Sequence, residues 1–201
     1  MKLMTSILVI ALFATGAMAE TANFGWEDGS STALGTYGNV GVVENVSTMA
    51  NSGTYSLHMT EDPLDGTPQV FVAWITDLME GDVVSASFYS YDDTPGSAPS
   101  SRIWGHYTEN GDIAVYQGSA GGNNTYTSGI GWEEQTHSWT VSAGKEALCI
   151  EFRMYSAEGL VDYYVDDITV TAPDHATIYL PNTEPVNTSA NSLGSVKALF
   201  R

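Results

Sequence analysis

The sequence predicts an all-β protein, an antiparallel β-sandwich followed by a flexible C-terminal tail. Between about residues 23 and 171, short runs rich in β-branched and aromatic residues alternate with clusters of Gly, Pro, Asn and Asp, a pattern typical of sandwiches and barrels. Within several runs apolar and polar residues alternate, as on strands with one buried face. The single cysteine, Cys149, excludes an intramolecular disulfide, so a packed core must stabilise the domain.

The predicted elements are nine strands and a short N-terminal one, which suggests two stacked sheets. The nine are expected at residues 39–46, 54–60, 69–76, 82–91, 101–108, 113–117, 132–141, 147–155 and 163–171. The segments 92–99 and 119–131, which are rich in Gly and in Pro or Asn, are predicted to be loops. After Pro173 the chain becomes polar, so residues 174–201 are expected to form a linker and a short C-terminal tail.

The first nineteen residues have the features of a secretory signal peptide. Lys2 precedes an apolar run from Ile7 to Phe13, and Ala17-Met18-Ala19 is a cleavage site of small residues. The apolar run is too short to span a bilayer, and no later stretch is long enough. We therefore expect export with removal of residues 1–19, and no insertion into a membrane.

The formal net charge of −18 narrows the classes of partner, because the chain has six Lys and Arg against 24 Asp and Glu. Such a surface repels nucleic-acid phosphates and anionic lipids, and favours cations and neutral ligands. Nucleic-acid binding is therefore not expected. Excess acid also serves solubility alone, so the charge by itself does not identify a ligand.

Three predicted strands, 82–91, 101–108 and 147–155, carry aromatic and charged residues on their polar faces. If these strands are neighbours, one candidate ligand face contains Tyr89, Tyr91, Arg102, Trp104, His106, Glu151, Arg153 and Tyr155. Aromatic rings stack on sugar rings, and charged groups bind their hydroxyls. The alternative is a structural lattice of ion pairs and rings on an exposed sheet.

Two acidic clusters lie at the ends of the predicted domain, Glu27-Asp28 and Asp166-Asp167. If Asp166 shares the buried face of the last strand, it needs a cation or strong hydrogen bonds to remain charged. Calcium prefers hard oxygen ligands, which carboxylates and the backbone of the turn at 51–54 can supply. The alternative is that these acids cap turns or face solvent.

The motifs that begin and end the domain resemble those of the jelly-roll carbohydrate-binding modules of secreted bacterial proteins. They are Asn23-Phe24-Gly25-Trp26-Glu27, Asn51-Ser52-Gly53-Thr54-Tyr55-Ser56-Leu57 and Val165-Asp166-Asp167-Ile168-Thr169-Val170. The resemblance implies that residues 20–173 form a jelly roll with a structural calcium. It assigns the metal to Glu27, to the turn near Ser52 and Tyr55, and to Asp166.

No catalytic template is present, such as a Gly-x-Ser-x-Gly elbow or a His-Glu-x-x-His helix. The sequence therefore predicts a secreted, non-catalytic module that binds a polysaccharide or glycan. The alternative is a structural or adhesive surface protein that uses the same face for protein contacts, with a tail that directs assembly or self-association at the cell surface.

Overall fold

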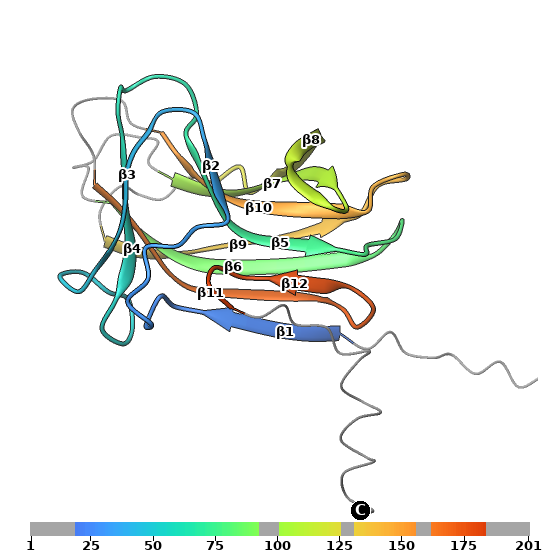
Figure 1. Cartoon of the computed structure of the whole chain (residues 1–201), viewed down its shortest axis with the longest axis horizontal. Coiled ribbons are helices and arrows are strands. Elements are labelled where there is room, and N and C mark those ends of the chain that lie inside the picture. Colours follow the sequence, from blue (N-terminus) through green and yellow to red (C-terminus); the bar gives the residue numbers. More distant parts are fainter. Residues whose placement is uncertain (1–18, 93–100, 126–130, 156–161, 184–201) are drawn as a thin grey trace, which may run out of the picture.

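The chain folds into two six-stranded antiparallel sheets (Figure 1). The computed structural model describes residues 19–92, 101–125, 131–155 and 162–183, and these ranges contain twelve strands and no helix. The predicted all-β sandwich is confirmed. The predicted leader, except Ala19, and the predicted tail from residue 184 lie outside the described residues, as does most of the predicted loop 92–99. In the described ranges, no helix has the length and apolarity to cross a membrane.

The first sheet, sheet A, contains both the first and the last long strand of the domain. Its order is β3 (Val40–Val46), β4 (Ser56–Glu61), β11 (Asp162–Pro173), β6 (Val83–Asp92) and β9 (Gly131–Thr140), and β1 (Ala19–Phe24) also pairs with β11. Phe24 lies opposite Ile168 in this pair. The first and last long strands of the domain are therefore neighbours.

The second sheet, sheet B, carries the candidate site. Its order is β12 (Thr177–Tyr179), β5 (Gln69–Thr76), β10 (Ala147–Met154), β7 (Ser101–Glu109) and β8 (Asp112–Gly122), and β2 (Gly35–Tyr37) also pairs with β5. The central strand β10 thus lies between β5 and β7, and its outward side chains form the middle of one sheet face.

The core lies between the two sheets and follows the period-2 pattern of the strands. Leu148, Ile150 and Phe152 of β10 are fully buried, and Phe152 meets Phe88 of β6 with ring centroids 5.6 Å apart. Each such side chain contributes about 1.5–3 kcal/mol by burial. Truncating Phe152 to alanine would therefore cost about 3–5 kcal/mol.

The structure corrects the predicted elements in three places. The short strands β2 and β12 were not expected, because three residues are too few to show an alternating pattern. Strand β8 continues to Gly122, through the first part of the predicted loop 119–131. The sandwich also extends beyond residue 173, since β12 pairs with β5 and Ile178 and Leu180 belong to the core.

Candidate ligand-binding cleft

Six of the eight residues predicted to form a ligand face come together on the outer face of sheet B. β7 contributes Arg102, Trp104 and His106, β10 contributes Glu151 and Arg153, and Tyr155 follows β10 directly. The two strands are neighbours, with Trp104 opposite Glu151 and Arg102 opposite Arg153.

The grouping of Tyr89 and Tyr91 with this face is wrong. Both lie on β6, which belongs to sheet A between β11 and β9. Alternation along a strand shows which side chains share a face, but not which strands are neighbours. Tyr91 instead packs against Trp132 and Tyr164, with ring centroids 5.6 and 5.8 Å away, so it belongs to an aromatic ladder across the opposite sheet.

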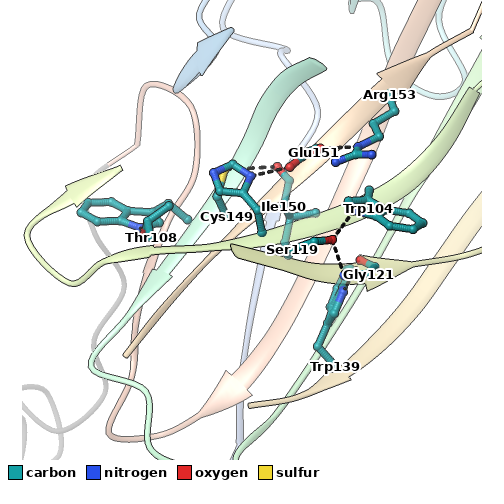
Figure 2. Close-up of polar contacts among 11 residues, drawn as sticks. Trp104, Thr108, Ser119, Gly121, Trp139, Cys149, Ile150, Glu151 and Arg153 are labelled. Atoms are coloured by element: carbon teal, nitrogen blue, oxygen red, sulfur yellow. Dashed lines mark hydrogen bonds and ion pairs between the residues drawn. The ribbon is translucent and has the colours of Figure 1, made fainter. Parts of the chain in front are cut away.

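A buried carboxylate fixes two cationic or polar side chains on the floor of the site. Glu151 is fully buried, and its two oxygens contact Nδ1 of His106 and Nε of Arg153, the latter at 2.5 Å (Figure 2). A buried charge is tolerated when it is paired and hydrogen-bonded in this way. The side chains of His106 and Arg153 are therefore held in one arrangement before any ligand binds.

Trp104 packs against two guanidinium groups. The Cζ atoms of Arg102 and Arg153 lie 4.3 and 4.6 Å from its ring centroid, within the range of cation–π attraction. Its indole N–H donates to Oγ of Ser119 on β8 at 3.0 Å (Figure 2). Arg102 also donates from Nε to the Tyr155 hydroxyl at 2.9 Å. These contacts make the floor rigid.

Strands β2 and β8 enclose part of this floor in a cleft of about 490 Å³, which His106, Glu151 and Arg153 line and Arg102, Trp104 and Tyr155 do not. Its lining comes from five strands: Thr36, Tyr37, Gln69, Phe71, His106, Ile113, Ala114, Tyr116, Glu151 and Arg153. β2 can lie close against β5 because Gly35 has no side chain. A Cβ at this position would lie only 2.8 Å from the Phe71 ring. β8 pairs with β7 through three register shifts, and such bulges bend and twist a strand. Figure 1 shows β8 rising above the sheet.

Two exposed aromatic side chains in this cleft were not among the predicted site residues. Tyr37 on β2 is 67% exposed and Tyr116 on β8 is 64% exposed, whereas most other aromatic side chains are at least partly buried. Their exposure depends on β2 and β8 standing at opposite edges of sheet B, which the sequence does not show. The one local signal in the sequence is that Tyr37 is flanked by Gly35 and Gly38, in a segment without other apolar residues.

A second depression of about 420 Å³ continues beyond Tyr37. It shares Tyr37 and Gln69 with the cleft and is otherwise lined by the segments 38–39 and 65–67. The two depressions therefore form one extended surface that passes Tyr37 and crosses the edge of sheet B.

The residues to which the resemblance assigned a calcium ion meet at one turn. The backbone N–H groups of Thr54 and Tyr55 donate to Glu27 at 2.9–3.0 Å, and those of Asn51 and Ser52 donate to Asp166 at 2.9 and 3.3 Å. Both carboxylates thus bind the turn 51–55 from opposite ends of the chain. These hydrogen bonds from backbone N–H groups satisfy lone pairs of the carboxylate oxygens, but they bring no positive charge to the cluster.

Asp166 is the most perturbed acid of this cluster. It is fully buried beside Asp167, whose φ of 51° accompanies a bulge in β11. Loss of hydration raises the pKa of Asp166 to about 6, against the lowering effect of its backbone hydrogen bonds. Across the described ranges, the ion pairs do not include Glu27, Asp166 or Asp167. The negative charge of the cluster is therefore not balanced by a basic side chain.

The carboxylate oxygens of this cluster are the type of ligand that calcium prefers. A Cβ built at Gly25 would lie 3.3 and 3.4 Å from carboxylate oxygens of Asp166 and Asp167, so a side chain at this position would crowd both carboxylates. In the part of the chain that the structure describes, no three His, Cys, Asp or Glu side chains form a metal centre by themselves. A bound ion would therefore need backbone oxygens as well as the carboxylates.

Comparison with known proteins gives a likeness of fold. No protein-family model matches the sequence, and no curated protein matches it. The solved structure of the CBM22-1 xylan-binding domain of Xyn10C from Paenibacillus barcinonensis is similar, with a TM-score of 0.57, 19% identity, and coverage of 79% of this chain and 98% of that one. The CBM22-1–CBM22-2 tandem of the same protein gives a TM-score of 0.58 and 16% identity over 80% of this chain and 47% of that one.

The chain therefore shares its fold with these solved carbohydrate-binding modules. At these identities the likeness extends to the sandwich and not to the ligand, because function depends on the side chains of the site. The expected jelly-roll fold is confirmed, and the ligand must be argued from the cleft itself.

Proposed function

We propose that this chain is a secreted, non-catalytic carbohydrate-binding module that binds a polysaccharide in the cleft on sheet B. The observation that carries the proposal is the pair of exposed rings, Tyr37 and Tyr116, standing at the two sides of a floor of fixed polar groups. Rings that stack on a sugar and polar groups that bind its hydroxyls are what such a site requires.

The rigidity of the floor supports binding. Arg153 and His106 are already held by Glu151, and Trp104 is held by Ser119 and two arginines. Side chains that are ordered before binding lose little further conformational entropy when a ligand arrives. Affinity can then come from a few contacts.

The length of the surface supports a polymer over a small sugar. The cleft of about 490 Å³ and the depression of about 420 Å³ meet at Tyr37 and Gln69. An extended chain that stacks on Tyr116 can continue past Tyr37 without leaving the surface. The xylan-binding domains that share the fold make β-linked polysaccharides the first ligands to test.

We include a structural calcium ion in the proposal. Glu27, Asp166 and backbone oxygens near Ser52 and Tyr55 would hold it, and the uncompensated carboxylates at the turn support this role. The bound ion would supply positive charge between the two ends of the domain. Its function would be stability and not ligand binding, because these residues do not line the cleft.

The test is binding of the mature protein to a panel of insoluble and soluble polysaccharides, with Tyr116→Ala and a matched control. Stacking on one face of a tyrosine covers roughly 60 Å², which at 25 cal/mol per Å² is about 1.5 kcal/mol, or roughly tenfold in affinity. Tyr116→Ala should therefore bind about tenfold more weakly. Tyr89→Ala removes a ring from the opposite sheet and should bind as wild type.

Two results would contradict the proposal. The first is the absence of binding to every polysaccharide tested by a folded wild-type protein. The second is equal loss of binding in Tyr89→Ala and Tyr116→Ala, which would move the site away from sheet B.

A further inference from the structure

We infer that the cleft selects a largely neutral glycan that carries occasional carboxylate groups, and that the guanidinium of Arg153 binds the carboxylate. This inference rests on the proposed function and adds the chemical class of the ligand. It follows from where the few basic residues lie, from the free edge of Arg153, and from the charge of the rest of the molecule.

Basic residues are concentrated at this site. Of six Lys and Arg in the chain, the structure describes three, which are Arg102, Lys145 and Arg153. Two of these three are direct cross-strand partners on the outer face of sheet B. Like charges placed opposite one another on a sheet are unfavourable. Two of the three described basic side chains are therefore held side by side on this face, despite the cost of placing like charges together.

Arg153 presents one particular edge to a ligand. Its Nε donates to Glu151, and its guanidinium lies over Trp104 with Cζ 4.6 Å from the ring centroid. Within the described ranges, neither terminal nitrogen makes a hydrogen bond to the protein. The side chain lines the cleft and is 16% exposed. The two terminal nitrogens form a planar donor pair that matches the two oxygens of a carboxylate.

Neighbouring groups allow an acidic sugar at this position. Glu151 is the only acid among the residues that line the cleft, and its charge is already shared by His106 and Arg153. Gln69 lies directly opposite Arg153 on β5, and Tyr37 lies directly opposite Gln69 on β2. One strip across three strands thus offers a guanidinium, an amide and an exposed ring.

The net charge of −18 limits how much acid the ligand can carry. At physiological ionic strength, exposed charges are largely screened beyond about 8 Å. A single carboxylate on Arg153 is therefore governed by the cleft, whereas a polymer with acid on every sugar also passes the acidic surface outside it. Asp65 already lines the adjoining depression. The cleft should therefore prefer a glycan that carries few carboxylates to one that carries a carboxylate on every sugar.

The experiment compares three polymers by isothermal titration with the mature protein. They are glucuronoxylan, the same polymer after reduction of its carboxyl groups to alcohols, and polygalacturonate. Hydrogen bonds to charged groups contribute about 1.5–3 kcal/mol, so glucuronoxylan should bind at least about tenfold more tightly than its reduced form. Raising the salt concentration should reduce this ratio. Polygalacturonate should bind more weakly than glucuronoxylan.

Two variants test the role of Arg153 without depending on each other. Gln69→Glu places a carboxylate opposite Arg153, and it should abolish the preference for the acidic polymer while the protein still binds the reduced one. Arg153→Lys keeps a positive charge but loses the planar donor pair, and it should reduce the preference several-fold. Thermal melting confirms that each variant is folded, and Gln69→Glu keeps both Glu151 and Arg153 in the sequence.

Equal binding of native and reduced glucuronoxylan would overturn this inference and leave the proposed function standing. Binding of polygalacturonate as tight as that of glucuronoxylan would also overturn it, because attraction of any polyanion would then explain the result. Failure to bind any of these polymers, together with failure across the neutral panel, would overturn the proposed function itself.

Discussion

Replacing Glu151 with glutamine tests whether one buried charge organises the candidate site. Glutamine has nearly the same shape, but it offers one acceptor oxygen where the carboxylate offers two. In the wild-type protein those two oxygens receive His106 Nδ1 and Arg153 Nε. The variant can keep one of these bonds and must place its NH₂ group against the other donor.

The expected loss of stability follows from the burial of the three groups. Removing one partner of a buried ion pair costs about 3–5 kcal/mol. Glutamine retains one hydrogen bond, and the 16% exposed side chain of Arg153 keeps some contact with water, so the free energy of unfolding should fall by about 2–3 kcal/mol. For a domain of this size, that is roughly 5–10 °C in Tm.

The measurement is thermal and urea unfolding of Glu151→Gln beside wild type. Glu134→Gln is the matched control, because Glu134 is an exposed glutamate on β9, and its Tm should not change. The midpoint in urea should fall for Glu151→Gln while the m-value stays constant. A Tm within about 1 °C of wild type would refute the assignment of a buried ionic anchor.

Two further predictions concern the ends of the sandwich. Calcium at millimolar concentration should raise the Tm of the mature protein, whereas EDTA should lower it and magnesium should have little effect; an unmoved midpoint would rule out the structural ion. The pKa of Asp77 lies below its ordinary value, chiefly because the side chain of Asn110 donates to it and also because Thr177 of β12 does. A lowered pKa adds stability at neutral pH that is lost as the pH falls below about 4, so Asp77→Asn should make the Tm less sensitive to acid in that range; identical acid profiles for wild type and variant would contradict this.

The strands and their faces were predictable because alternation is a local property. In β10, the apolar set from Leu148 to Met154 is fully buried, and the opposite set carries the polar site. The same alternation predicted that Ile103 is inside and that Arg102, Trp104 and His106 lie on the other face of β7. Side-chain direction on a strand depends only on the pleat, so it can be read one strand at a time.

The composition of the cleft depended on contacts between distant parts of the chain. Tyr89 and Tyr91 alternate just as Trp104 and His106 do, yet they lie on the opposite sheet because β6 pairs with β11 and β9. Tyr37 and Tyr116 became site residues only because β2 and β8 stand at opposite edges of sheet B. No local pattern distinguishes these cases.

The sequence by itself determined the all-β class and the outward faces of β7 and β10, since both follow from the alternation of residues along each strand. Only the tertiary structure decided which strands are neighbours, and with them the walls of the cleft and the burial of Glu151 against Arg153 and His106. The reason is physical: strand pairing is a choice among nearly equivalent backbone ladders, and it is settled by how two whole sheets pack over one core.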